Sequence, residues 1–202
     1  MHYEKNKKRV FDVVFASLFL ILFSPLLILI AILIKLDSKG PIIFKQIRVG
    51  RNMKDFHVVK FRTMHIVQSN HSLLTIGNHD TRITRLGYWL RKYKLDELPQ
   101  LLNVLKGQMS LVGPRPEVRK YVNLYNDEQR YVLSVKPGIT DWASVEFCNE
   151  NELLKHAEDP ETYYVERIIP AKIKQNMRYI NHNDILTDFK IILLTINRIV
   201  IN

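Results

Sequence analysis

The chain has 202 residues, of which 47% are hydrophobic and 25% charged, a composition that supports one domain, or one domain with an appendage, and excludes a disordered chain. A single cysteine, Cys148, excludes an internal disulfide framework and a cysteine-rich zinc site, and indicates a reducing compartment. The net charge of +10 predicts an anionic partner: nucleic acid, acidic lipid or a phosphorylated substrate.

The first predicted element is an apolar segment of 25 residues, 10–34, whose only charge is Asp12. A straight helix of that length reaches roughly 37 Å, enough to cross a bilayer core of ~30 Å as a single-pass anchor. Ser24 and Pro25 interrupt the segment near its centre, because Pro25 donates no backbone hydrogen bond and crowds the preceding turn. Basic residues flank both ends, which suits two ends on the same face of a membrane. We therefore predict a re-entrant helix-break-helix, in which Asp12 pairs with Arg9.

Residues 41–49 and 56–64 are apolar and basic runs on either side of a turn at 50–55, and they predict a β-hairpin. Residues 35–62 hold eight Lys or Arg against two Asp, which is typical of a solvated face or of a surface for anionic headgroups. The polar stretch that follows lacks the histidine spacing of a helical metal pair, so we predict no metal site there. Its histidines are His65, His71 and His79.

The rest of the chain has the apolar spacing of short helices. One is predicted over 81–93, a second begins near Asp96 and stops at Gly107, and a third covers 117–131. Residues 185–201 carry apolar side chains three and four positions apart. This last pattern predicts an amphipathic helix that packs on the domain or lies on a bilayer.

The predicted fold class is therefore α+β, with a re-entrant membrane helix, a small β-hairpin and several short amphipathic helices at the membrane interface. We expect residues 1–36 to form the basic flank and the re-entrant helix, and residues 37–202 to form one cytoplasmic, interfacial domain, the candidate catalytic domain. The sequence shows no internal repeat and no second soluble domain.

Asp96 and Glu97 form the most suggestive chemical pair. Acidic residues in the first turn of a helix often only cap it and complement its dipole. Here basic residues accompany them in the sequence, and carboxylates with several fixed cations suit a divalent metal and a diphosphate. An aspartate so placed can attack phosphorus. The candidate phosphate-binding residues are Lys60, Arg62, Arg91 and Arg115.

Six motifs occur in order along essentially the whole chain. They are Lys8-Arg9-Val10-Phe11-Asp12, Ser24-Pro25, Lys60-Phe61-Arg62-Thr63-Met64, Leu95-Asp96-Glu97-Leu98-Pro99-Gln100-Leu101, Gly113-Pro114-Arg115-Pro116 and Lys136-Pro137-Gly138-Ile139-Thr140. Together they make the chain resemble the bacterial sugar transferases, the monotopic polyprenyl-phosphate phosphoglycosyl transferases. Any one motif is weak, whereas six in order are specific.

The resemblance implies transfer of a sugar-1-phosphate from a nucleotide diphosphate sugar, usually a UDP-sugar, to a polyprenol phosphate such as undecaprenyl phosphate. It implies that Asp96 attacks the sugar-side phosphorus and releases UMP, leaving a covalent phosphosugar on the enzyme. Glu97 is implied to help hold Mg²⁺ together with Asp96, or to assist proton handling. The resemblance also implies that Lys60, Arg91 and Arg115 bind phosphate oxygens, at a cytoplasmic site on the bacterial inner membrane.

The chain departs from the family pattern where sugar specificity is plausibly set. Gln108 stands where many relatives have aspartate, Asp141 follows the Pro-Gly-Ile-Thr turn where many have glycine, and residues 146–161 lack the usual asparagine-glycine run. Glu161 is a candidate further acidic residue of the site, and a solvated face is the alternative interpretation.

Two other classes of function fit parts of the sequence. The net charge and the hairpin with alternating Phe, Lys and Arg suit a membrane-tethered nucleic-acid binder, but no nucleic-acid motif occurs. A membrane-surface scaffold, in which Asp96 only caps a helix, is the other. We expect a donor, a lipid acceptor and a bilayer as partners, no nucleic acid, and a homodimer as a further possibility for interfacial helices.

Overall fold

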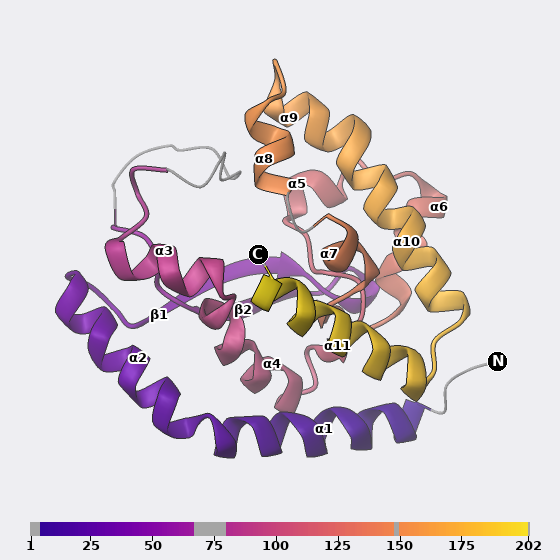
Figure 1. The fold of residues 1–202 in the computed structure, drawn as a ribbon. Helices are drawn as coiled ribbons and strands as arrows, with labels where there is room; N and C mark the ends of the chain where they lie inside the picture. The colour runs from indigo at the N-terminus through magenta and orange to yellow at the C-terminus, as the bar shows by residue number, and fades with distance from the viewer. Residues whose placement is uncertain (1–4, 67–79, 148–149, 202) are drawn as a thin grey trace.

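The computed structural model describes residues 5–66, 80–147 and 150–201, and its fold is α+β as predicted (Figure 1). Two small two-stranded sheets are surrounded by helices. Helix α1 (Lys5–Leu22) runs along the lower edge in Figure 1, and α11 (Ile185–Ile201) crosses in front of the strands. His71, His79 and Cys148, which the sequence analysis considered, lie outside the described residues.

The apolar N-terminal segment forms two helices, α1 and α2 (Ser24–Asp37), with a bend of 62° between them. The hydroxyl of Ser24 donates to the carbonyl of Ile21 at 2.8 Å, and Pro25 occupies the first turn of α2, where a missing N–H costs no helical bond. Among the described helices none alone is long and apolar enough to cross a membrane, whereas this bent pair meets the requirement of length and composition. The predicted break at Ser24 and Pro25 is thus present.

Asp12 does not pair with Arg9, and that prediction is wrong. Asp12 is 2% exposed, and its Oδ1 accepts hydrogen bonds from the Ser110 hydroxyl at 2.9 Å and the Leu111 N–H at 3.0 Å. Arg9 instead donates to the carbonyls of the last two residues of α4 (Leu101–Leu105). Both charged side chains therefore fasten α1 to the rest of the chain, because each finds backbone partners there that need satisfaction.

The predicted hairpin is confirmed as β1 (Ile43–Val49) paired antiparallel with β2 (Asp55–Phe61). Phe56 and Val58 of β2 are buried in the core. Lys60 is two residues further along the same face, because side chains alternate along a strand. The hairpin thereby directs Lys60 toward the turn that carries Asp96 and Glu97, against which β2 packs.

The helix predicted over 81–93 begins later, as α3 (Arg85–Lys92). Thr84 caps it by accepting a hydrogen bond from the Gly87 N–H at 2.9 Å, and the residue before the cap is held in a β-bridge. After α3 come a 3₁₀ turn, η2 (Leu95–Gln100), and α4, and Gly107 with a φ of 75° ends this run as predicted.

The second sheet pairs β3 (Ser110–Val112) in parallel with β4 (Gly138–Thr140). A Cβ added to Gly138 would lie 2.1 Å from the backbone nitrogen of Gly113. Only glycine at position 138 lets the segment after β3, which carries Arg115, lie so close to β4.

The helix predicted over 117–131 is broken into pieces. Asn126 accepts from the Gln129 N–H while the Gln129 side chain accepts from the Asn126 N–H, a capping box that starts a new helix. The pieces are α5 (Arg119–Val122), α6 (Asp127–Arg130) and the 3₁₀ turn η3 (Tyr131–Ser134).

The C-terminal third of the chain is helical. Its elements before α11 are α7 (Trp142–Glu146), α8 (Glu150–Lys155), α9 (Pro160–Tyr163), the π-helical turn η4 (Tyr164–Ile168) and α10 (Ile169–Asn181). Helix α10 rises along the right-hand side of Figure 1 and packs on α7.

Helix α11 forms as predicted and packs on α1. The Phe189 ring lies 5.2 Å from the Phe11 ring and 5.4 Å from the Phe15 ring, measured between centroids. Asp188 is fully buried on the same side and forms an ion pair with Lys8 at 2.5 Å. One face of α11 is therefore part of the domain.

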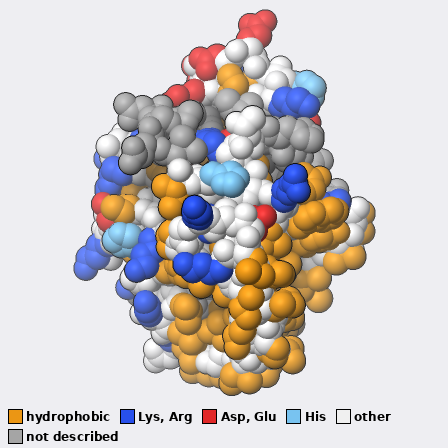
Figure 2. All heavy atoms as spheres, turned by 90° about the vertical axis from the view of Figure 1, so that its left-hand side faces the viewer, with side chains coloured by type: hydrophobic (Ala, Val, Ile, Leu, Met, Phe, Trp, Pro, Cys, Tyr) orange, Lys and Arg blue, Asp and Glu red, His pale blue; other side chains and the backbone are white. Residues whose placement is uncertain are grey.

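Large apolar side chains remain exposed on α1, α2 and α11. In Figure 2, hydrophobic side chains gather over the lower part of the face shown, where α1 and α2 lie, while Lys and Arg side chains lie above them. The exposed apolar residues of these helices include Val10, Val14, Leu18, Ile21, Leu22, Ile28, Leu29, Ile32, Leu36, Leu186, Leu193, Ile196 and Val200. An apolar surface of this extent marks a contact with a partner or a membrane.

Candidate active site

The turn η2 holds Asp96 and Glu97 beneath β2 and α3. Lys94, immediately before it, has a left-handed backbone with a φ of 54°, which turns the chain sharply out of α3. Asp96 and Glu97 are each 7% exposed. Neither carboxylate caps this turn, because the N-cap position is Lys94 and no side-chain cap hydrogen bond forms there, so their burial needs another explanation.

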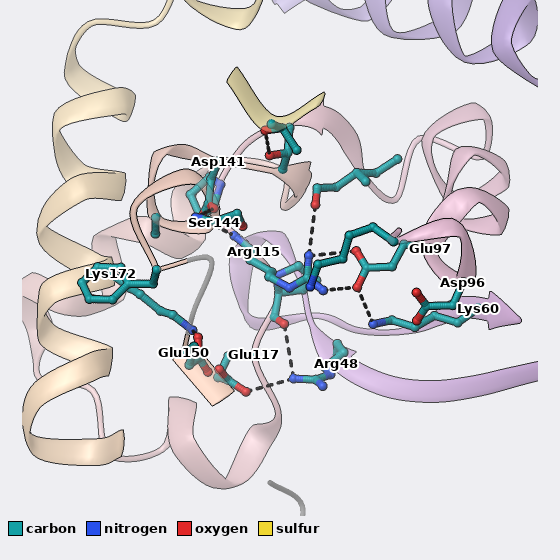
Figure 3. Close-up of a pocket in the computed structure, with 18 of the residues that line it drawn as sticks. Arg48, Lys60, Asp96, Glu97, Arg115, Glu117, Asp141, Ser144, Glu150 and Lys172 are labelled. Carbon is teal, nitrogen blue, oxygen red and sulfur yellow. Dashed lines mark hydrogen bonds and ion pairs between the residues drawn. The ribbon is translucent and has the colours of Figure 1, made fainter. Parts of the chain in front are cut away.

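Two cations bind the carboxylate of Glu97 (Figure 3). Lys60 Nζ lies 2.9 Å from Glu97 Oε1, and one terminal nitrogen of Arg115 lies 2.9 Å from Oε2. The other terminal nitrogen of Arg115 also donates to Oε1. Residues from a strand, a turn and the segment after β3 thus meet at one carboxylate, although they are far apart in the sequence.

Asp96 has no such partner. Its carboxylate accepts no hydrogen bond from any residue that the structure describes, although it lies on the wall of the same cavity as Glu97. Arg91, at the end of α3, and Lys94 also line this cavity, and neither forms an ion pair with a described residue. Among the described residues, the site therefore combines a carboxylate that accepts no hydrogen bond with cations that form no ion pair, Arg91 and Lys94 among them.

The two carboxyl groups differ in their electrostatics. Burial, and then the neighbouring charge of Glu97, raise the pKa of Asp96. Burial also opposes ionisation of Glu97, but Arg115 and Lys60 outweigh it and hold the pKa of Glu97 well below its usual range. Burial lowers the pKa of Lys60, and the Glu97 charge raises the pKa of Arg115. Glu97 is thus a neutralised anchor, while Asp96 is the more basic carboxylate.

A second contact fixes the backbone of Arg115. Its backbone N–H donates to Asp141 Oδ2 at 3.1 Å, and Asp141 Oδ1 accepts from the Ser144 N–H at 2.7 Å to cap α7. Asp141 is 1% exposed. In the sequence, Asp141 stands out only as a departure from the family pattern, and the general preference of aspartate for N-cap positions is the one signal of its role.

Arg62 and Glu161 lie away from this cluster. Arg62 is 4% exposed and donates to the carbonyls of Pro41 and Ser38 at 2.6 and 2.8 Å, so it binds the chain at the end of α2. Strand β2 ends one residue before Arg62, which is why it does not continue the face of Lys60. Glu161, on α9, is half-exposed and paired with Lys120. The structure brings together Lys60, Arg91, Asp96, Glu97 and Arg115, but not these two residues.

The cluster lines a cavity of about 960 Å³, large enough for a substrate. Phe19 and Phe23 line it beside the break between α1 and α2, and Ile192 and Ile196 line it from α11. Residues of α7 and α10 form another part of the wall. A charged site and an apolar surface therefore share one cavity.

The family model of the bacterial sugar transferases matches residues 3–202 of this chain. A UDP-glucose:undecaprenyl-phosphate glucose-1-phosphate transferase from Klebsiella pneumoniae is 40% identical over 96% of this chain and 40% of its own length. A UDP-N-acetylgalactosamine-undecaprenyl-phosphate N-acetylgalactosaminephosphotransferase from Aeromonas hydrophila is 45% identical over 68% of this chain and 33% of its own length.

A third relative, from Caulobacter vibrioides, is named as a UDP-glucose:undecaprenyl-phosphate glucose-1-phosphate transferase and is 39% identical over 94% of this chain and 68% of its own length. The chain thus spans about 40% or less of the length of the first two relatives. The match to the family model nevertheless covers nearly the whole of this chain. This chain belongs to the bacterial sugar transferase family.

Proposed function

We propose that this chain transfers a sugar-1-phosphate from a UDP-sugar to undecaprenyl phosphate, through a covalent intermediate on Asp96. The observation that carries the proposal is the contrast between Glu97, whose charge is neutralised by Lys60 and Arg115, and Asp96, which is buried without a described donor. The names of the relatives from Klebsiella and Aeromonas support the donor and acceptor classes.

In the first step, an Asp96 carboxylate oxygen attacks the phosphorus that bears the sugar. A bond forms between that oxygen and phosphorus, the bond to the bridging oxygen breaks, and UMP leaves with the electron pair. Phosphoryl transfer depends mainly on positioning and on neutralising charge. Arg91, Lys94 and Arg115 lie where they can supply that charge.

In the second step, a phosphate oxygen of undecaprenyl phosphate attacks the same phosphorus. The bond between phosphorus and the Asp96 oxygen breaks, which restores the free carboxylate and releases undecaprenyl-diphospho-sugar. This would be a first membrane step in the assembly of a glycoconjugate.

Mg²⁺ fits the chemistry of the donor groups. Magnesium commonly binds one or two carboxylates together with substrate phosphates, and Asp96 and Glu97 are adjacent carboxylates in this cavity. The described residues contain no cluster of three His, Cys, Asp or Glu side chains, so the diphosphate would supply the remaining oxygens. Bound there, Mg²⁺ would neutralise charge on the diphosphate. Lys60 and Arg115 hold Glu97 in place beside it.

The bent pair α1 and α2 supports a re-entrant anchor, with the active site at the cytoplasmic face of the bacterial inner membrane. Their exposed apolar side chains, with those of α11, would lie in the lipid. Phe19 and Phe23 join this surface to the cavity, which gives a lipid acceptor a route to Asp96. A scaffold or nucleic-acid-binding function would not explain why Asp96 is buried with no hydrogen-bond donor among the described residues.

The experiment is a panel of UDP-sugars with undecaprenyl phosphate and Mg²⁺, read out as UMP release. Wild-type protein should release UMP with at least one sugar, and Asp96→Asn should lose activity by on the order of 10³-fold or more. Glu161→Gln is the control, since Glu161 lies outside the cavity. Full activity in Asp96→Asn would refute the proposal.

A further inference from the structure

One face of α10 forms part of the cavity that holds Asp96 and Glu97. Ile169, Lys172, Ile173 and Asn176 are spaced three and four residues apart, and all four line it. Helix α7 packs against α10, and its Ala143 and Ser144 line the cavity too, as does Phe147 directly after it. This wall lies beyond Arg115, on the side of Asp141 and Ser144 in Figure 3.

Asn176 is the unusual residue of this wall. It is 6% exposed, and its Oδ1 is buried without a hydrogen-bond partner. Its Nδ2 donates no hydrogen bond to a residue within the described ranges either. A buried polar group without a partner costs about 1–3 kcal/mol, and such groups are rare in folded proteins. A carboxamide left unpaired in a substrate cavity therefore points to a ligand that pairs with it.

Lys172, one helical turn before Asn176, is already paired, and so is Glu117 elsewhere in the lining of the same cavity. Lys172 forms an ion pair with Glu150, and Glu117 binds both Arg48 and the Tyr164 hydroxyl. The other lining side chains of α7 and α10 are Ala143, Ile169 and Ile173, which are apolar, and Ser144, which adds one hydroxyl. Among the described residues, the wall thus offers mainly apolar surface with the Ser144 hydroxyl and one carboxamide that has no partner.

This combination favours a flat heterocycle over a sugar ring. A pyranose carries hydroxyl groups around its edge, and several of them would be buried here without partners. Uracil has apolar faces and an imide edge, in which the N3–H donor lies next to carbonyl acceptors. A carboxamide matches that edge with one acceptor and one donor.

We propose that Asn176 recognises the uracil base of the donor, with N3–H donating to Oδ1 and Nδ2 donating to the O4 carbonyl. This inference rests on the proposed function, which supplies the UDP-sugar. Asp141 links the two parts of the donor site, because it binds the Arg115 N–H and begins α7. The phosphates would thus lie at Arg115 and the base beyond it, against α7 and α10.

The test compares UMP with N3-methyluridine 5′-monophosphate, in which a methyl group replaces the N3 hydrogen. Calorimetry on the full chain in detergent should show that wild-type protein binds the methylated nucleotide at least about tenfold more weakly. In Asn176→Ala, UMP should weaken to a similar degree, and the two nucleotides should bind equally. Asn181→Ala is the matched control, since Asn181 is exposed on the same helix and should keep the wild-type difference.

Equal binding of both nucleotides to wild-type protein, or an unchanged difference in Asn176→Ala, would overturn the inference. So would a change in the ratio of kcat/KM between UDP-glucose and UDP-N-acetylgalactosamine in Asn176→Ala, because that result places the sugar at this wall. Asn176→Leu, which keeps the side-chain volume, replaces the alanine variant if the latter does not fold. The wild-type comparison needs no variant at all.

The two proposals fail in different ways. If selective UMP binding depends on Asn176 but no UDP-sugar is turned over, the proposed function fails and the base site stands. If UMP is released from a UDP-sugar and Asn176 has no effect on the N3-methyl difference, the base site fails and the proposed function stands. Asp96→Asn should keep the difference between the two nucleotides, since Asp96 lies at the phosphate end.

Discussion

Asp96 and Glu97 are neighbours in the chain and equally buried, yet Lys60 and Arg115 form ion pairs with Glu97 and none with Asp96. Lys60 and Arg115 neutralise Glu97 and leave Asp96 as a carboxylate with a raised pKa. A buried carboxylate that forms no ion pair with the protein stays available to a metal ion and to phosphorus, and it is also less stable in the fold. The following predictions test this division.

Substitution of the two carboxylates should change stability in opposite directions. A raised pKa means that ionised Asp96 is less favourable in the folded than in the unfolded chain, and the folded protein bears this cost in full above that pKa. Asp96→Asn should therefore raise the free energy of unfolding at pH 7, by roughly 1.4 kcal/mol for each unit of the shift. Glu97→Gln should lower it by roughly 1–3 kcal/mol, because Lys60 and Arg115 lose their partner. Denaturant unfolding in detergent measures both, and a loss of stability in Asp96→Asn would contradict the assignment.

The fall in kcat/KM at low pH, the acidic limb of the pH–rate profile, should follow the titration of the Asp96 carboxyl group. The attacking form is ionised, so kcat/KM should fall as the pH drops through the raised pKa. The charge of Lys60 lowers the pKa of Asp96, so Lys60→Gln should move this limb to higher pH by roughly one unit. Lys60→Arg keeps the charge and should leave the limb in place. A limb that stays at the same pH in Lys60→Gln would exclude Asp96 as the titrating group.

Arg115 and Arg62 are both candidate phosphate-binding residues in the sequence, but substitutions at the two positions should have different effects. Arg115→Lys loses the two-nitrogen contact with Glu97 and should lower kcat/KM roughly 100-fold with little loss of stability. Arg62→Lys should leave the KM for the donor unchanged and lower the free energy of unfolding by roughly 1–3 kcal/mol, because Arg62 binds carbonyls at the end of α2. A donor KM that rises in Arg62→Lys with stability intact would return Arg62 to the phosphate site.

Local features of the fold were predictable from the sequence. The break at Ser24 and Pro25 follows from proline chemistry, and the hairpin follows from two apolar runs around a short turn. The stop at Gly107 follows from the ability of glycine to adopt positive φ. Each of these depends on residues close together in the chain.

Long-range contacts were not predictable in the same way. The sequence places Asp12 one helical turn from Arg9, but tertiary contacts with Ser110 and Leu111 decided its partner. Alternation along β2 suggests that Arg62 follows Lys60, but the strand ends at Phe61. Whether Asn176 Oδ1 finds a hydrogen-bond partner depends on how α7 and α10 pack, and no sequence motif predicts it.

The membrane anchor should keep both ends of the chain on one side. Reporter tags at the two termini should both be cytoplasmic, because the bend of 62° divides the apolar segment into two arms. The double variant Ser24→Leu/Pro25→Leu restores a helical N–H and removes the break, so it should place the tags on opposite faces. A periplasmic C-terminus in the wild-type chain would contradict the re-entrant anchor.

The most direct test of the central claim is the mass of the intact protein, quenched during turnover with a UDP-sugar and without acceptor. The account predicts a gain equal to the donor's phosphosugar, located on Asp96 by peptide mapping, absent from Asp96→Asn and lost when undecaprenyl phosphate is added. Wild-type protein that releases UMP while its mass never changes, or an adduct that forms on a residue other than Asp96, would contradict it.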